Sequence, residues 1–382
     1  MIKQLLLAPG PTPVPSRVRL AMAQPMFHHR TPQFSALFGE VRTQLQELFQ
    51  TEQDVLVLAA SGTGAMEASV NNCFAPGDEV IFVNGGKFGE RWGKLATTFG
   101  LKPIEIRVEW GRAVRPDQIE QALAEHPNVK GVLLQASETS TAAVHPIDQI
   151  AAVTRKTNAL LVVDGITAVG VYSIPMDKWG IDVLITGSQK ALMLPPGLAL
   201  VALSARAWER VEQTKQPRFY FDLPRERSNQ AKNTTAWTPA ISLVIGLKEA
   251  LMMMQEEGYA NVYARHERLA KATRSAGAAL GMRLVAPDNP SPAVTGLYTP
   301  EGIDGGKLFS YLRDKMQVVF AGGQDQLKGK IIRIAHLGYI GTFDTITAVA
   351  SLEMALKHFG HPVELGRGVG AAQAELMSAL PA

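Results

Sequence analysis

Lys190 is the residue of this chain whose position most directly suggests chemistry. It lies in the stretch TGSQKAL, residues 186–192, directly after the apolar run that begins at Asp182. A lysine that follows a buried strand either caps that strand or is held away from water. Desolvation lowers the pKa of an amine and makes it a usable nucleophile for a carbonyl carbon. The surrounding sequence has to decide between the two interpretations.

Three other polar stretches also follow apolar runs of strand length. They are SGTGAMEA from Ser61, SETSTA from Ser137 and DGIT from Asp164. Each of them alone is ordinary turn and helix-cap chemistry. In an open parallel sheet, however, the carboxyl ends of the strands meet at one edge, and ligands bind in the crevice beyond it. We therefore expect these stretches and Lys190 to lie close together.

Together the stretches supply what pyridoxal phosphate requires. Ser61, Gly62 and Thr63 at a helix start offer unpaired backbone N–H groups, hydroxyls and the positive end of the helix dipole, which suit a phosphate. Asp164 can pair with a cationic ring nitrogen, and Lys190 can form a Schiff base. The first stretch is not a P-loop, because no Gly-Lys-Ser/Thr follows it. It is not a dinucleotide fingerprint either, because the third glycine is missing at the required spacing.

Six continuous apolar runs predict buried strands. They span 54–61, 78–85, 131–137, 159–165, 182–188 and 198–203. Continuous rather than alternating runs are typical of strands that are buried on both faces. Amphipathic stretches at 35–49, 89–100, 117–125 and 146–156 predict helices around them. Alternating strands and helices indicate an α/β fold with a mainly parallel sheet.

The pattern of alternating apolar runs and amphipathic stretches ends at about residue 240. Residues 241–280 are predicted to form one long helical region, and strands are expected near 293–298, 318–320 and 330–334. This pattern indicates a smaller C-terminal α+β domain. We predict an N-terminal arm over residues 1–16, a large α/β domain over 17–257 and a small domain over 258–382, with the boundary near Gly258.

The composition narrows the classes of partner. The 382 residues include 38 Lys and Arg and 35 Asp and Glu, so the formal net charge is +3. Without a dense basic block, neither nucleic acid nor a membrane surface is an expected partner. No apolar run approaches membrane-spanning length and no signal-like segment is present, which favours a cytoplasmic location. A single cysteine, Cys73, and one adjacent histidine pair give no reason to expect a metal site.

The motifs, in this order and spacing, resemble those of class V (fold type I) pyridoxal-phosphate aminotransferases. SGTGAMEA, ETST, VVDGITAVG and GSQKALMLPPG carry the resemblance, together with APGPTPVP, TPAISL and KIIRIAHLG. The resemblance covers nearly the whole chain and is greatest to the alanine–glyoxylate and serine–pyruvate aminotransferase group. It implies a homodimer that uses pyridoxal 5′-phosphate. The implied reaction moves an amino group from a small amino acid, alanine or serine, to a small 2-oxo acid, glyoxylate or pyruvate.

The resemblance assigns roles to individual residues around the coenzyme. Lys190 is implied to be its covalent anchor and the acid and base of proton transfer. Asp164 is implied to keep the ring nitrogen protonated. Phe88, in GGKFGERW, is implied to stack on the ring, and Thr139 to hydrogen-bond the ring oxygen. The residues implied to surround the phosphate are Ser61, Gly62, Thr63 and Gln189.

The resemblance also implies contacts to the substrate and to a partner subunit. Arg333, in KIIRIAHLG, is implied to clamp the substrate carboxylate, because a planar guanidinium pairs with a carboxylate through two hydrogen bonds. The backbone near Gly10 is implied to approach the same carboxylate, and Arg30 to lie near the entrance. Family enzymes borrow a phosphate ligand from the neighbouring subunit. Thr235 in KNTTAWTPA, with Thr234 beside it, falls where that loop is expected.

Two departures from the family pattern and several alternatives remain at this stage. The family's STG is STA here, with Ala142 in place of glycine, and SGTGAM replaces a segment that carries histidine in some alanine–glyoxylate enzymes. A cysteine desulfurase needs a mobile cysteine late in the chain, whereas Cys73 falls in a predicted early helix. A lyase or a phosphonate-specific transaminase on the same scaffold stays open. Lys190, Asp164 and Arg333 argue against a non-catalytic binding protein.

Overall fold

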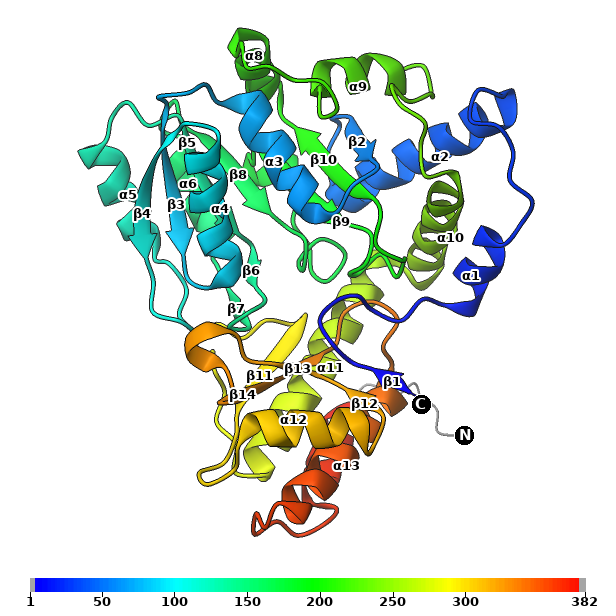
Figure 1. Cartoon of the computed structure of the whole chain (residues 1–382), viewed down its shortest axis with the longest axis vertical. Coiled ribbons are helices and arrows are strands. Elements are labelled where there is room, and N and C mark those ends of the chain that lie inside the picture. Colours follow the sequence, from blue (N-terminus) through cyan, green and yellow to red (C-terminus); the bar gives the residue numbers. More distant parts are fainter. Residues whose placement is uncertain (1–3, 378–382) are drawn as a thin grey trace.

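The computed structural model describes residues 4–377 and shows a larger α/β part and a smaller part (Figure 1). The larger part is built on a seven-stranded sheet with the order β2-β10-β9-β8-β5-β3-β4. Its strands are Val55–Leu58 (β2), Glu79–Asn84 (β3), Lys102–Arg107 (β4), Gly131–Gln135 (β5), Leu160–Asp164 (β8), Val183–Gly187 (β9) and Ala199–Leu203 (β10). Neighbouring strands are parallel except that β10 is antiparallel to both β9 and β2. The predicted α/β class with a mainly parallel sheet is confirmed.

The edge strand β4 was not predicted from the sequence. The six predicted apolar runs all correspond to strands of this sheet, but β4 lacks such a run because its exposed residues interrupt the apolar ones. It pairs with β3 alone. Pro103 is tolerated there because an edge strand has a side on which no ladder hydrogen bond is needed.

Helices cover both faces of the sheet because side chains alternate between the faces along each strand. Residues such as Leu56 and Phe82 pack against α3, α4 and α8, whereas Val57 and Ile81 belong to the core with α2, α5, α6 and α10. The helices of this part are Ser16–Met22 (α1), Pro32–Phe49 (α2), Gly62–Cys73 (α3), Lys87–Thr98 (α4), Pro116–Glu125 (α5), Ile147–Thr154 (α6), Met176–Trp179 (α7), Ala205–Gln213 (α8), Leu223–Gln230 (α9) and Ile241–Glu257 (α10). No helix within residues 4–377 has the length and apolar character required to span a membrane.

The smaller part combines helices with an antiparallel sheet of order β11-β14-β13. Its elements are Tyr259–Ala279 (α11), Val294–Tyr298 (β11), Gly305–Asp314 (α12), Ala321–Gly322 (β13), a 3-10 turn Asp325–Leu327, Ile331–Ala335 (β14), Thr342–His358 (α13) and Arg367–Met377 (α14). The prediction of one helical region over 241–280 was wrong in one respect. Gly258, with a φ of 82°, separates α10 from α11, because this left-handed conformation cannot continue a helix.

The N-terminal arm is integrated into the smaller part. Leu5–Leu6 (β1) pairs in parallel with Val318–Val319 (β12), the strand predicted near 318–320. Leu7 is buried in the core of the smaller part, to which Leu269 of α11 also belongs, whereas Val262 of α11 packs with the larger core. The change of core along α11 supports our proposal of a boundary near Gly258.

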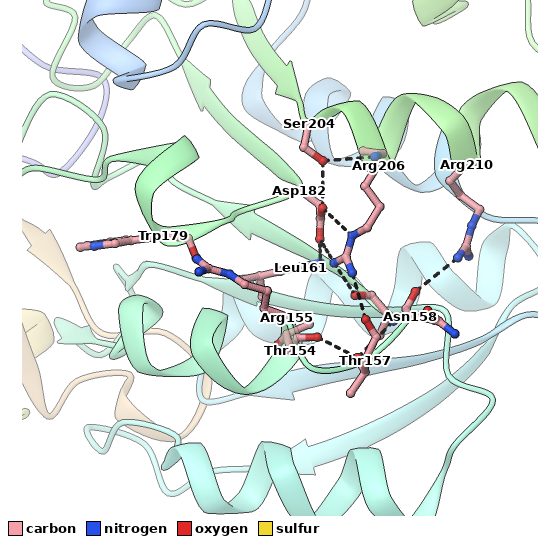
Figure 2. A network of polar contacts seen from close by, with 12 residues as sticks. Thr154, Arg155, Thr157, Asn158, Leu161, Trp179, Asp182, Ser204, Arg206 and Arg210 are labelled. Carbon is pink, nitrogen blue, oxygen red and sulfur yellow. Dashed lines mark hydrogen bonds and ion pairs between the residues drawn. The ribbon is translucent and has the colours of Figure 1, made fainter.

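A polar network fixes the amino end of β9 beside the strand β8 (Figure 2). Asp182 is buried, and its Oδ2 accepts hydrogen bonds from the N–H of Leu161 at 2.8 Å and from Nη2 of Arg206 at 2.5 Å. Its Oδ1 accepts from Oγ of Ser204 at 2.8 Å and from Nε of Arg206 at 3.1 Å. Arg206 also donates to the carbonyl of Thr157. The network sets the relative position of the strands that end at the site described below.

We expect Asp182→Ala to lower the free energy of unfolding by about 2–4 kcal/mol, because several buried donors lose their acceptor together. Urea unfolding followed by tryptophan fluorescence measures the change. Asp117→Ala is the control, because Asp117 pairs with Arg115 on the surface and such a pair contributes about 0–1 kcal/mol. Equal shifts for the two variants would contradict a structural role of the network.

Candidate active site

A cavity of about 100 Å³ opens beyond the carboxyl ends of β5, β8 and β9. It is lined by residues that the sequence predicted, namely Ser61, Gly62, Thr63, Phe88, Thr139, Asp164, Gln189 and Lys190. Arg91, Ser137, Ile166 and Thr167 complete the lining. The segments that follow four strands and the amino end of α4 therefore meet at one edge of the sheet, as expected for a parallel sheet.

Lys190 follows β9 and has a buried amine. Its Nζ donates a hydrogen bond to the carbonyl oxygen of Pro9 at 2.6 Å. Burial lowers the pKa of the amine to about 8; the Asp164 carboxylate raises this pKa, whereas Arg333 and Arg91 lower it. At weakly alkaline pH a large fraction of the amine is therefore neutral, which is the form that attacks a carbonyl carbon. The hydrogen bond to Pro9 and the lowered pKa argue against the interpretation of Lys190 as a mere strand cap.

The N-terminal arm packs directly on the lysine loop. Oγ1 of Thr12 donates to the carbonyl of Lys190 at 2.8 Å, and the N–H of Thr12 donates to the carbonyl of Gln189 at 3.1 Å. Gly10 has a φ of +129°, and a Cβ there would lie 2.2 Å from Nζ of Lys190, so glycine is required. The structure thus places Gly10 beside the amine, and its contact with a substrate carboxylate stays a prediction.

Asp164 is the last residue of β8 and lines the same cavity. Its Oδ1 accepts a hydrogen bond from the N–H of Ile166 at 2.8 Å. Burial raises the pKa of the carboxyl to about 6; the Ile166 hydrogen bond lowers it, the charge of Glu138 raises it, and the Arg91 and Lys190 charges lower it. A carboxylate held in this way gains from a cationic partner placed in the cavity.

The amino end of α3 offers several free hydrogen-bonding groups. Ser61 is the N-cap, yet its hydroxyl does not cap the helix. The first N–H groups of a helix have no acceptors within it, which makes them available to an anion. Gly62 lets Ile166 approach, because a Cβ there would lie 2.4 Å from that side chain. Oε1 of Gln189 is buried without a hydrogen-bond partner among the described residues.

Glu138 holds Phe88 in place, and sequence analysis assigned it no role. Its Oε2 accepts hydrogen bonds from the N–H groups of Phe88 at 3.1 Å and Gly89 at 2.9 Å, in the first turn of α4. Oε1 of Glu138 accepts two hydrogen bonds from Ser140, one from its N–H at 3.0 Å and one from its hydroxyl at 2.6 Å. Burial raises the pKa of this carboxyl, and the hydrogen bonds oppose that effect. The glutamate is part of the ETST motif, but a glutamate after a strand also suits an ordinary cap.

Arg333 lies on β14 and is tied to the wall of the cavity. Its Nη1 donates to the carbonyl of Thr139 at 2.8 Å, while Nε and Nη2 donate to the carbonyl of Gly322 at 3.1 and 2.8 Å. Burial lowers the pKa of the guanidinium to about 10, and the charge of Glu138 raises it. The hydroxyls of Thr139 and Thr167 are 2.8 Å apart on the same wall, so the position of Thr139 is fixed from two sides.

Gly10 and Arg333 adjoin this cavity through Lys190 and Thr139 without lining it, and Thr235 and Arg30 do not line it either. Thr235 lines a separate small cavity of about 20 Å³, together with Tyr220 and Trp237, and its hydroxyl donates to the carbonyl of Trp237 at 2.6 Å. Arg30 is exposed just before α2. The contact of Thr235 with the phosphate of a partner subunit and the position of Arg30 near an entrance therefore stay predictions.

Comparison with known proteins identifies the class of protein that this fold and site define. The sequence pattern of the family "Aminotransferase class-V" matches residues 6–338, so the chain belongs to the class V aminotransferases. Their solved relatives have fold type I, as predicted, and the cofactor is pyridoxal 5′-phosphate.

Individual relatives cover nearly the whole chain. The "Soluble hydrogenase 42 kDa subunit" of Anabaena cylindrica is 43% identical over 97% of this chain and 98% of its own. The serine–glyoxylate aminotransferase of Methylorubrum extorquens is 34% identical over 97% and 95%. The crystal structure of an alanine–glyoxylate aminotransferase from Nostoc sp. superposes with a TM-score of 0.89 at 30% identity, over 93% of this chain and 96% of that one.

The residues at the cavity fit pyridoxal 5′-phosphate. The amino end of α3 has free donors of the kind that bind a phosphate, Asp164 is a carboxylate of the kind that pairs with a protonated ring nitrogen, and Lys190 is a desolvated amine at the same cavity. The buried amide oxygen of Gln189 has no hydrogen-bond partner among the described residues, and the opposite orientation of this amide directs its NH₂ donor to the same place, which suits a phosphate oxygen. When bound, the coenzyme supplies an electron sink for the Cα–H bond of an amino acid.

We expect Asp164→Asn to lower the pKa of Lys190 below about 8, because the Asp164 carboxylate raises that pKa and the amide carries no charge. The pH dependence of acylation of Lys190 in the coenzyme-free protein, followed by peptide mass spectrometry, measures this pKa. Asp148→Asn, at an exposed position on α6, is the control. A pKa that rises in Asp164→Asn would show that the assumed coupling is wrong.

Glu138→Gln tests whether Glu138 fixes the position of Phe88, the residue predicted to stack on the coenzyme ring. An amide has one acceptor oxygen, so either orientation sets an NH₂ group against N–H donors that now face a carboxylate oxygen. We expect a loss of about 2–4 kcal/mol in unfolding free energy and weaker coenzyme binding, measured by thermal unfolding and by fluorescence titration. Unchanged coenzyme affinity would mean that Glu138 does not fix Phe88.

Proposed function

We propose that this aminotransferase moves an amino group from a small amino acid, alanine or serine, to a small 2-oxo acid, glyoxylate or pyruvate. The free donors of Arg333 are the observation that carries the proposal. A guanidinium has five N–H donors, and three of them are used on the carbonyls of Thr139 and Gly322. One N–H remains on each terminal nitrogen, and in this proposal these two donors form the fork that pairs with the substrate carboxylate through two hydrogen bonds.

The protein backbone holds this fork in a fixed orientation, so little side-chain entropy is lost when a carboxylate binds. Arg333 and Lys190 are close enough for the charge of the former to lower the pKa of the latter. A substrate whose carboxylate lies on Arg333 therefore has its Cα near the amine. The relatives named for serine–glyoxylate and alanine–glyoxylate transamination support this choice of substrates.

Lys190 and Asp164 have separate roles in the proposed reaction. The amine of Lys190, with a pKa of about 8, can take a proton from the substrate Cα and return it near neutral pH. Asp164, with a pKa of about 6, is mostly ionised at neutral pH and stabilises a proton on the ring nitrogen. Thr139 and Phe88 line the same cavity, and in this proposal Thr139 hydrogen-bonds the ring oxygen and Phe88 stacks on the face of the ring.

We also propose that two chains form a homodimer with shared sites. Phe219 and Tyr220 are exposed and lie against Trp237, beside the cavity that contains Thr235. Exposed aromatic clusters of this kind are typical of interfaces. In such a dimer Thr235 is our candidate for the phosphate ligand from the partner subunit, with Thr234 beside it.

A desulfurase is disfavoured by the state of the single cysteine. Cys73 is fully buried in α3, and burial raises the pKa of its thiol to about 12. The thiolate needed for nucleophilic attack is therefore scarce at neutral pH. Similarity to a solved cysteine desulfurase from Thermococcus onnurineus, at 15% identity, shows the fold alone.

Half-reactions test the substrate. Wild-type protein loaded with coenzyme is mixed with alanine, serine or 2-aminoethylphosphonate, and conversion to the aminated coenzyme is followed by absorbance. We expect both carboxylate donors to react and the phosphonate to react poorly, because a tetrahedral phosphonate does not match the planar fork of Arg333. A fast reaction with the phosphonate, or none with either carboxylate donor, would overturn the proposal.

Arg333→Gln is expected to lower kcat/KM for alanine and serine by about a hundredfold or more, because a charge-assisted pair is lost in a buried site. Coenzyme affinity should change little. Arg107→Gln, on the exposed edge strand, is the control. A loss of coenzyme affinity equal to the loss of kcat/KM would instead indicate a structural role for Arg333.

A further inference from the structure

Arg91 is a cation of the cavity to which neither the sequence motifs nor the proposed reaction assigns a role. It lies on α4, one helical turn after Phe88, and lines the same cavity. Its Nη1 donates to Oγ1 of Thr63 at 2.8 Å, at the amino end of α3. The centre of its guanidinium lies 5.0 Å from the centroid of the Phe88 ring, which is cation–π distance. Arg91 therefore links the end of α3 to the stacking residue.

The charge of Arg91 has no partner on the protein side. Within residues 4–377, no carboxylate lies within 4.0 Å of its guanidinium, whereas its neighbour Glu90 is bound by Lys87 and Lys94. Arg42 and Arg206, which are also partly covered, both pair with an aspartate. The guanidinium of Arg91 therefore has unused donors at the cavity that are available to an anion.

The charged residues around the cavity include more cations than carboxylates. Lys190, Arg91 and Asp164 line it, Arg333 donates to the carbonyl of the lining residue Thr139, and Glu138 accepts a hydrogen bond from the N–H of Phe88. In the proposed reaction, Arg333 binds the substrate carboxylate and is therefore not available to another anion. Arg91 is hydrogen-bonded to Thr63, at the opposite functional end, where the helix dipole and free N–H groups also favour negative charge.

We propose that Arg91 is the counter-ion of the coenzyme phosphate and couples the phosphate site on α3 to the stacking residue Phe88. This inference rests on the proposed assignment of the amino end of α3 as the phosphate site. The charge of Arg91 also lowers the pKa of both Asp164 and Lys190, so it acts across the whole cavity. A bound phosphate that neutralises Arg91 therefore raises the pKa of Lys190.

A second source of the same anionic chemistry is the side-chain carboxylate of a dicarboxylic amino acid. The experiment separates the two sources by using pyridoxal 5′-phosphate, pyridoxal without the phosphate, and aspartate as a donor. Dissociation constants of both coenzyme forms are measured for coenzyme-free wild type, Arg91→Gln and Arg91→Lys by fluorescence titration. Lys94→Gln, an exposed position on the same helix, is the matched control.

We expect Arg91→Gln to weaken binding of pyridoxal 5′-phosphate by roughly ten- to a hundredfold, the loss of one charge-assisted contact. Binding of pyridoxal should change less than about threefold, and Arg91→Lys should recover part of the affinity because it keeps the charge. Inorganic phosphate should raise the pKa of Lys190, measured by its acylation, in wild type and not in Arg91→Gln.

Two outcomes would overturn the inference. Equal losses for both coenzyme forms would mean that Arg91 acts through the packing of Phe88. Unchanged affinity for pyridoxal 5′-phosphate, with a higher KM for aspartate but not for alanine, would assign the anion to the substrate. Because coenzyme binding is measured without an amino acid, failure of the alanine and serine half-reactions would sink the proposed function and leave this result intact.

Discussion

The removal of water from the amine of Lys190 is the constraint on which the rest of the site depends. An exposed lysine is protonated at neutral pH and does not attack carbonyl carbons. Here the amine follows a buried strand, and the N-terminal arm closes over it through Pro9, Gly10 and Thr12. The seven-stranded sheet, the network around Asp182 and the packing of the arm all serve to hold one amine at one place.

The charged residues at the cavity shift the pKa of this amine together, and among the described residues they do not form separate ion pairs with one another. Asp164 raises its pKa, while Arg333 and Arg91 lower it, so its protonation responds to whatever anions bind at either end. Glu138 lies outside the cavity and acts indirectly, by fixing the first turn of α4 and by raising the pKa of Asp164. The protein thus leaves charged side chains at the cavity without ion-pair partners, and a bound coenzyme and substrate would neutralise them.

Much of this arrangement follows from the sequence because its signals are local. Continuous apolar runs predicted six strands of the sheet, and the polar residues after them predicted the side chains that meet at its edge. The exposed strand β4 gave no such run, since half of its surface faces water. Arg91 and Glu138 were missed for another reason: an arginine on a helix and a glutamate after a strand have common structural explanations, and only three-dimensional contacts show that both surround Phe88. The role of Thr235 depends on a second chain and lies beyond what one chain can show.

The pairing of β1 with β12 has a consequence for how the protein is made. Residues 5–6 find their partner strand at 318–319, and the N–H of Ala335 donates to the carbonyl of Leu7. The pairing that fixes the start of the arm can therefore form only after residue 319 has been synthesised, when all seven strands of the larger sheet have already left the ribosome. The larger sheet thus precedes the anchoring of the chain's own first strand, although that strand is synthesised first.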